Sequence, residues 1–192
     1  MRTVTLPTFD TPSPANIAPG ETSATPRKSD SAFWRFSLRF YARDGVAPMC
    51  LALQDQHGID VNVLFLLLFL AHHQRQLTPA EVQKIDHAAA AWRTRAVQPL
   101  RALRRDLKNG VTGMDATATE ALRSEIKRCE LHAEHLQQEM LERAFPAAST
   151  GLASPAKEAA AANIAAYDTV IGGLPDTSTQ SLLRWFAEEF AV

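Results

Sequence analysis

A nearly unbroken apolar run at residues 61–71 is the feature that most constrains how this chain can fold. The run reads Val-Asn-Val-Leu-Phe-Leu-Leu-Leu-Phe-Leu-Ala. A helix made from it has no polar side, so other elements must cover it all round. Its length as a helix is roughly 16 Å, about half of the hydrocarbon core of a bilayer, and His72, His73, Gln74 and Arg75 follow it directly. We therefore predict a buried central helix over residues 61–74 and not a membrane span.

The composition of the 192 residues fits one domain of ordinary size with extensions. Hydrophobic residues make up 46% of the chain, enough for a core, and no stretch rich in Val, Ile and Thr alternates with period two. The fold class that we predict is all-α. Four helices form a compact, bundle-like core around residues 61–74, additional helices follow at the C-terminus, and a disordered tail precedes the core.

Charge and cysteine usage narrow the class of protein further. The net charge is −1 at pH 7, so the whole molecule does not attract polyanions by bulk charge. Cys50 and Cys129 have no metal-type or redox-type spacing, and we interpret both as buried, small hydrophobic residues in a reducing compartment. The first residues lack the apolar segment of a signal peptide. We expect a cytoplasmic protein.

Helix start and stop signals divide the chain into three parts. Residues 1–30 are rich in Pro, Ser and Thr, which predicts a disordered leader. Residues 31–110 form the predicted core domain, in which Thr78-Pro79-Ala80-Glu81 matches a capping box with Pro at the first helical position. The last helix of this domain is expected to kink near Pro99 and to end near Lys108. The expected helices of the core domain are residues 32–42, 46–56, 61–74 and 79–108.

Residues 111–192 form the predicted C-terminal helical extension. Its long helix, residues 120–145, has apolar residues spaced 4-3-4-3-4, which is a heptad seam. This helix is expected to pack on the bundle or to pair with another helix, so oligomerisation through it is one option. An Ala-rich helix at residues 157–171 and an amphipathic helix at residues 178–190 follow. The seam consists of Leu122, Ile126, Cys129, Ala133, Leu136 and Met140.

Polar residues gather at residues 54–62, directly before the apolar run, and we call this stretch the elbow. If the four core helices run up and down with short loops, the elbow meets the start of the first helix and the later part of the fourth at one end of the bundle. Two tryptophans and two arginines would join it there, and such a set can bind a small anion or a peptide terminus. The predicted binding residues are Trp34, Arg35, Gln54, Asp55, His57, Asp60, Asn62, Trp92 and Arg93.

The elbow also has a structural explanation. Asp60 can cap the helix that follows it, and Gly58 suits the left-handed residue that ends the helix before it. His57 can bond the free carbonyls at that helix end, and Asn62 can satisfy buried amide groups of the turn. In that case these residues position the helices and bind no ligand.

Metal binding is not expected at either histidine-containing cluster. His72 lies roughly 18 Å along the helix from Asp60, so no second histidine reaches the elbow. Cys129, His132 and His135 are spaced three residues apart, which spreads them over too wide an arc of one helix for a compact zinc site.

Basic residues are frequent on the predicted fourth helix after Trp92. Asp106 is the only acidic residue among them. Nucleic acid, anionic lipid or an acidic partner would be attracted to such a face, but no helix-turn-helix or aromatic platform accompanies it. A solvated face that is partly neutralised by acidic residues of 120–142, or by Glu188 and Glu189, explains it as well. Beyond Arg93, the predicted basic face consists of Arg95, Arg101, Arg104, Arg105 and Lys108.

Several unusual sequence pieces occur in a fixed order between residues 32 and 108. They are Phe33-Trp34-Arg35-Phe36-Ser37-Leu38, Tyr41-Ala42-Arg43-Asp44-Gly45-Val46, Leu51-Ala52-Leu53-Gln54-Asp55-Gln56-His57-Gly58, Asp60-Val61-Asn62, Trp92-Arg93 and Val97-Gln98-Pro99-Leu100-Arg101-Ala102-Leu103-Arg104-Arg105. In these pieces the chain resembles a small all-helical proteobacterial family of unknown function. The resemblance implies a helical, cytoplasmic protein and carries no known activity.

The sequence leaves three hypotheses about function. No P-loop, dinucleotide fingerprint or nucleophile motif is present, so we favour a protein that is not an enzyme and has no cofactor. The first hypothesis is a protein-binding or adaptor module. The second is a small-ligand-binding enzyme or sensor built on the elbow, and the third is nucleic-acid binding through residues 93–108. An elbow sealed by its own bonds speaks against the second, and an open cavity lined by Trp34, His57 and Trp92 speaks against the first.

Overall fold

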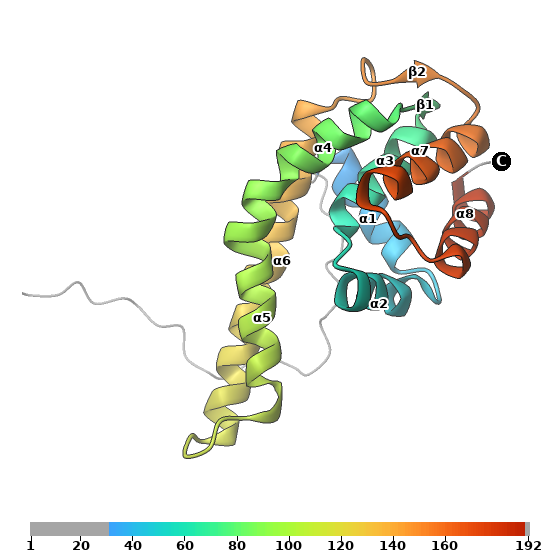
Figure 1. The fold of residues 1–192 in the computed structure, drawn as a ribbon. Coiled ribbons are helices and arrows are strands. Elements are labelled where there is room, and N and C mark those ends of the chain that lie inside the picture. The colour runs from blue at the N-terminus through green and yellow to red at the C-terminus, as the bar shows by residue number, and fades with distance from the viewer. Residues whose placement is uncertain (1–30, 191–192) are drawn as a thin grey trace, which may run out of the picture.

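The fold, taken from a computed structural model, is described for residues 31–190 and is all-α, as predicted (Figure 1). The predicted disordered leader, residues 1–30, lies outside the described residues. Two short strands, β1 (Arg75–Gln76) and β2 (Leu152–Ala153), pair antiparallel. The helices are α1 (Ala32–Tyr41), α2 (Val46–His57), α3 (Val61–His72), α4 (Pro79–Trp92), α5 (Gln98–Asp106), α6 (Ala116–Ala144), α7 (Ala156–Ile171) and α8 (Asp176–Phe190).

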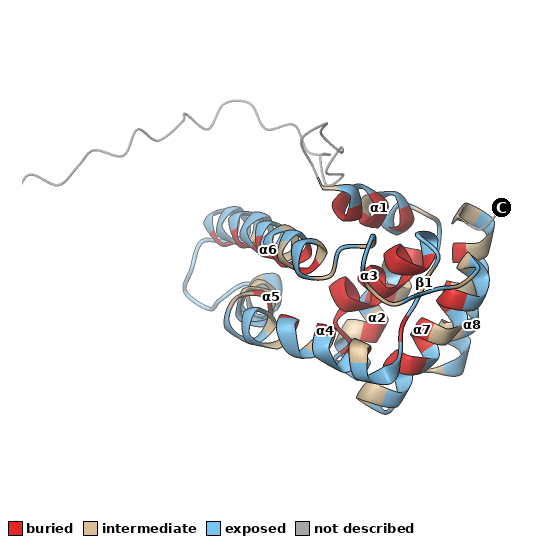
Figure 2. Cartoon of the chain, turned by 90° about the horizontal axis from the view of Figure 1, so that it is seen from above, coloured by how far each residue is buried: buried red, intermediate tan, exposed pale blue. Residues whose placement is uncertain are grey.

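Helix α3 lies at the centre of the fold, and every residue from Val61 to Ala71 is buried. Helices α1, α2, α4, α6 and α7 pack around it, and Figure 2 shows the buried residues gathered on α3 and on the sides that face it. The predicted central helix is therefore confirmed, although it ends at His72, because Gln74 adopts a positive φ of 58° in the turn towards β1. Within residues 31–190, no helix is both long and apolar enough to cross a membrane.

The C-terminal helices complete the cover of α3. Buried residues of α7 and α8, among them Ile164, Tyr167 and Phe186, belong to the same hydrophobic core as those of α1–α4. Fully buried Asn163 ties α7 to α3 and to the segment after it: its amide nitrogen donates to the carbonyl of Leu67 in α3 at 3.0 Å, and its oxygen accepts from the backbone nitrogen of Leu77 at 2.7 Å. The domain boundary at residue 110 stays a prediction, and the stretches on either side of it share one core.

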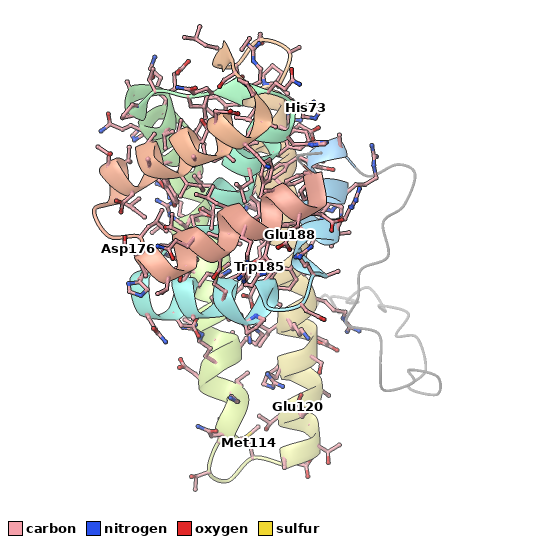
Figure 3. All side chains as sticks on the ribbon, turned by 90° about the vertical axis from the view of Figure 1, so that its right-hand side faces the viewer. His73, Met114, Glu120, Asp176, Trp185 and Glu188 are labelled. Carbon is pink, nitrogen blue, oxygen red and sulfur yellow. The ribbon has the colours of Figure 1, made fainter. Side chains whose placement is uncertain are left out.

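Helices α5 and α6 form a hairpin, residues 98–144, whose connecting end projects from the rest of the fold, while the second half of α6 packs on α1, α3 and α4 (Figure 1). We call this hairpin the arm, and α1–α4, α7 and α8 the body. Figure 3 shows Met114 and Glu120 at the far end of the arm. A π-helical turn, Arg93–Val97, joins α4 to α5 directly before Pro99. A proline ring clashes with the carbonyl four residues earlier, and the wider π-turn accommodates it, where the sequence predicted a kink.

The side of α6 that packs inward differs from the predicted heptad seam. Ile126 and Ala133 are buried, but Leu122 and Leu136 are 50% and 41% exposed, and Cys129 is exposed as well. The interpretation of Cys129 as a buried residue is therefore wrong, whereas Cys50 is buried as expected. The inward side carries polar residues because the surface that α6 meets is charged. Leaving those buried charges without a partner would cost more free energy than exposing a leucine does. These inward residues are Thr119, Glu130, Gln137 and Gln138.

Candidate functional site

The elbow is shaped by the ends of α2 and α3. Gly58 adopts the left-handed conformation that ends α2, with φ 65°. One carboxylate oxygen of Asp60 accepts hydrogen bonds from the backbone nitrogens of Asn62 at 2.9 Å and Val63 at 3.3 Å, which caps α3. Both expectations for these two residues are confirmed, and this oxygen of Asp60 is fully used by the backbone.

The other side of the elbow is a buried polar network with α6. The second oxygen of Asp60 accepts from the amide of Gln137 at 2.7 Å. The amide of Asn62 donates to Gln137 at 3.2 Å and accepts from Gln138 at 2.7 Å. Since a buried polar group without a partner costs roughly 1–3 kcal/mol, these bonds fix α6 against the start of α3. The two glutamines were not predicted from the sequence as part of the elbow. Their position directly after Leu136 of the apolar seam was the only signal that could have pointed to them.

Arg93 connects this network to α4. Its guanidinium donates to Asp60 at 3.1 Å and to Asp86 at 2.7 Å. Burial disfavours the cation, but the bonds and charges of Asp86 and Asp60 outweigh this and raise the pKa of Arg93. Burial also raises the pKa of the nearby Tyr167 phenol, with the charge of Asp60 adding to the effect. Arg93 is therefore a permanent cation that holds together the elbow and α4.

The tryptophans predicted to flank the elbow lie against α6. Trp34 is buried and its ring stacks on His135 with 4.3 Å between centroids. The indole nitrogen of Trp92 donates to the carbonyl of Ala133 at 2.9 Å. Helix α6 contacts both α1 and α4, so it occupies the space in which the sequence placed the two indoles together.

Other residues of the predicted binding set lie towards solvent. His57 is exposed in the last turn of α2, and Arg35 is exposed on α1. Asp55 forms an ion pair with Arg105 of α5. The structure thus brings Asp60, Asn62 and Arg93 together, and as binding residues the whole predicted set stays a prediction.

A cleft of about 210 Å³ opens between the elbow and the start of the arm. Each of its arginines is already paired with a carboxylate, on Asp60, Glu130 or Asp55. Neither tryptophan of the predicted set lines the cleft, nor does His57. Its lining consists of Gln54, Gly58, Ile59, Asp60, Val61, Asn62, Arg93, Val97, Gln98, Arg101, Ala102 and Arg105.

Part of the predicted basic face is turned into the arm. Arg101 donates to Glu130 at 2.9 Å and to Glu134 at 2.5 Å, and Arg104 donates to Glu130 at 2.5 Å. Acidic residues of α6 therefore neutralise this face, which is the first of the two explanations that the sequence offered. The other acidic pair, Glu188 and Glu189, meets Arg39 of α1 and Arg43 in the turn after α1 instead. Arg95, Arg105 and Lys108 are exposed.

The two carboxylates inside the arm have opposite pKa shifts. Burial alone would raise the pKa of Glu130, but the hydrogen bonds from Arg104 and Arg101 outweigh it and lower that pKa. For Glu134, burial dominates over the charge of Arg101, and the pKa is raised. Glu130 is thus the firmly ionised centre of the arm. Among residues 31–190, no group of three or more His, Cys, Asp or Glu side chains is arranged to hold a metal ion.

These features define a small all-α protein with one buried central helix, a polar elbow at its start and a projecting, ion-paired arm. Residues 32–141 match the model of a family described as a protein of unknown function (DUF2390), and the chain belongs to this family. The match confirms the resemblance to an uncharacterised family and extends it from α1 to nearly the end of α6. Neither a curated protein nor a solved structure matches the chain.

Proposed function

We propose that this protein is a cytoplasmic, non-enzymatic protein-binding module and that the outer side of its arm contacts the partner. The observation that carries this proposal is an exposed apolar line on α6, next to an interface between α5 and α6 that is held by buried ion pairs. Free Cys50 and Cys129 are compatible with a reducing compartment.

The inside of the arm is charged. Glu130 is 6% exposed and bonds two arginines of α5. A buried ion pair of this kind gives no more stability than well-packed apolar residues would. Glu130 and its two arginines occupy part of the interface between the helices, whereas Leu103 of α5 and Leu122 and Leu136 of α6 are left exposed.

The outside of the arm is apolar along one line. Leu122, Cys129 and Leu136 are spaced seven residues apart, so they lie within about 40° of one another around α6. We call these three residues the arm stripe. Leu103 on α5 and Val111 and Met114 at the tip are also largely exposed. Heptad spacing is the spacing that a partner helix recognises, and a clustered exposed apolar line on an otherwise charged surface is typical of an interaction site.

The test is a site-specific photo-crosslink in the native cell. A photoreactive phenylalanine analogue at position 136 should give a discrete crosslinked product. Leu131 is the matched control, because it is 41% exposed like Leu136 but lies about 140° away around the helix. Crosslinking at 136 and not at 131 supports the proposal, and the mass of the product tells whether the partner is a second copy or another protein. Equal yields at both positions, or none at either, contradict it.

A second candidate is small-ligand binding, as a sensor or enzyme, in the cleft beside the elbow. It is favoured by the polar part of the lining, which includes Gln54, Gln98, Asn62 and Arg93. Gln54→Leu and Gln98→Leu would then abolish stabilisation of the protein by a ligand found in a thermal-shift screen, while His57→Ala, outside the cleft, would not. A ligand that still stabilises the Leu variants does not bind there.

Nucleic-acid binding through residues 93–108 has less support, because Arg101 and Arg104 are bonded to Glu130. If this function were correct, affinity for duplex DNA would fall steeply between about 50 and 200 mM salt. Absent or salt-independent binding of a labelled duplex removes it.

A further inference from the structure

A second hollow, of about 240 Å³, lies at the other end of α3, between that helix end, α1 and the end of α8. We call it the basic-aromatic groove. Only Arg35 among its residues belongs to the set that the sequence singled out for binding. The groove is lined by Ala32, Arg35, Phe36, Arg39, Phe69, His72, His73 and Phe190.

Aromatic rings from three helices form the floor of the groove. The centroid of the Phe36 ring lies 4.4 Å from the centroid of the Phe190 ring and 5.6 Å from that of the Phe69 ring. The imidazole of His72 lies 5.2 Å from Phe190, and that of His73 lies 4.6 Å from Phe69. Phe36 and Phe69 are buried, whereas both histidines are exposed. The floor therefore offers apolar ring faces, with polar nitrogens only at its edge.

The rim of the groove is basic. Arg35 and Arg39 are one helical turn apart on α1 and so share a face. The guanidinium of Arg39 lies 5.1 Å from the centroid of the Phe190 ring and donates to Glu189 at 2.6 Å. Arg35 has contacts of its own. None of the described residues that line the groove is acidic.

We infer that the basic-aromatic groove binds a small organic anion, a carboxylate or phosphate attached to an apolar body. Guanidinium groups bond such oxyanions through paired N–H donors, and the aromatic floor covers an apolar body. An inorganic anion would make no apolar contact with the aromatic floor, and a neutral apolar molecule would make no charged hydrogen bond with the basic rim. The volume lies below the ~300–1,000 Å³ of sites for drug-sized ligands, so the ligand is compact.

The protonation of His72 adds a dependence on pH. Burial, with help from the neighbouring His73, lowers the pKa of His72. The charged groups that face it are Arg35 and Arg39 from α1 and Glu189 from α8, besides His73. A bound anion favours the imidazolium form, so binding tightens as the pH falls below about 6.5.

The test is an NMR titration of the full chain that observes the histidine imidazoles. The probe is 4-phenylbutyrate, and its controls are the neutral 4-phenylbutyramide and inorganic phosphate. We expect 4-phenylbutyrate to shift His72 and His73 saturably and to leave His57 and His87 in place. Both controls should bind at least about tenfold more weakly, because each loses either the charge-assisted hydrogen bonds or the apolar contact. Tighter binding of phenyl phosphate than of 4-phenylbutyrate would identify the anion as a phosphate monoester.

A pair of variants separates binding from packing. Arg39→Gln removes a cation that lines the groove, whereas Arg43→Gln removes one that bonds the same Glu189 from outside it. We expect Arg39→Gln to weaken 4-phenylbutyrate at least about tenfold and Arg43→Gln to leave the affinity unchanged, with folding checked by circular dichroism. Equal affinities for the acid and its amide, equal effects of the two variants, or shifts that do not centre on His72 and His73 overturn the inference. If Arg39→Gln fails to fold, the comparison of ligands on the wild-type protein decides alone.

Discussion

The body of this protein is built around an apolar helix, whereas the arm is built around a buried carboxylate. The body surrounds α3, on which every residue from Val61 to Ala71 is buried. The arm surrounds Glu130, which is buried between Arg101 and Arg104, and exposes Leu122 and Leu136. The body is therefore stabilised by removing apolar area from water, and the arm by charge-assisted hydrogen bonds. The comparison shows that the arm leaves apolar side chains exposed while it buries charged ones, and these exposed side chains form the surface that we propose for partner binding.

The largest effect is expected from a truncation in the body. Leu66 is fully buried in α3, and Leu66→Ala should lower the free energy of unfolding by about 2–5 kcal/mol, since it leaves a cavity that its neighbours cannot fill. Urea unfolding measures this loss. Leu103→Ala, in the arm, is the control, because Leu103 is already half exposed. Equal losses in the two variants would contradict the distinction between body and arm.

A smaller loss is expected from Glu130→Gln in the arm. The change leaves Arg101 and Arg104 without their shared carboxylate, and should cost about 1–3 kcal/mol at pH 7. Glu134→Gln is the matched control on the next turn of α6, where burial already disfavours the charge. That variant should be neutral or slightly stabilising, as measured by urea unfolding. If Glu134→Gln costs more than Glu130→Gln, the assignment of Glu130 as the centre of the arm is wrong.

The same residue predicts how stability depends on pH. The pKa of Glu130 is lowered from its ordinary value of 4.5 in the folded protein. A lowered pKa stabilises the fold at pH values above the ordinary one, and this contribution disappears as the pH falls below it. The wild type should therefore lose stability below about pH 4.5 more steeply than Glu130→Gln does. Thermal unfolding at a series of pH values measures both slopes, and identical slopes contradict the prediction.

The smallest effect on stability is expected from the arm stripe. Leu122→Gln and Leu136→Gln replace exposed side chains, so each should change the free energy of unfolding by less than about 0.5 kcal/mol. Both should nevertheless remove the partner that the photo-crosslink at position 136 identifies, while Leu131→Gln retains it. Partner binding by the purified variants is measured by calorimetry. A large loss of stability with unchanged binding would make the stripe part of the core instead of an interface.

The contrast between body and arm also marks how far the sequence could predict the structure. The apolar run at residues 61–71, the cap at Asp60 and the left-handed Gly58 follow from local chemistry, and each was predicted. The inward side of α6 was not, since it depends on where α5 places Arg101 and Arg104 after the π-turn. A heptad pattern shows which residues share a side of a helix, and it does not show which side meets a charged surface.

The candidate site was predicted only in part, because the sequence shows local features and not the packing of distant segments. Asp60, Asn62 and Arg93 are close together because a short turn joins α3 to α4, so that the end of α4 returns to the level of the elbow at the start of α3. The two tryptophans were expected beside them, but α6 packs between α1 and α4. No local pattern in the sequence predicts the packing of a helix that is distant along the chain. The basic-aromatic groove depends on Phe190 of α8 reaching α1 and α3, which is again a contact between distant segments.

Native-state hydrogen exchange at two pH values tests most directly whether the body and the arm are stabilised differently. Protection factors corrected for intrinsic rates are compared for α3 and for α5 with the first half of α6. From pH 7 to pH 3.5 the arm should lose protection by about tenfold more than α3, because below pH 4.5 the opened arm takes up a proton at Glu130 that the folded arm, with its lowered pKa, resists. If α3 loses protection first, or if both regions lose it together, the arm is not held by its ion pairs and its apolar side has no separate role.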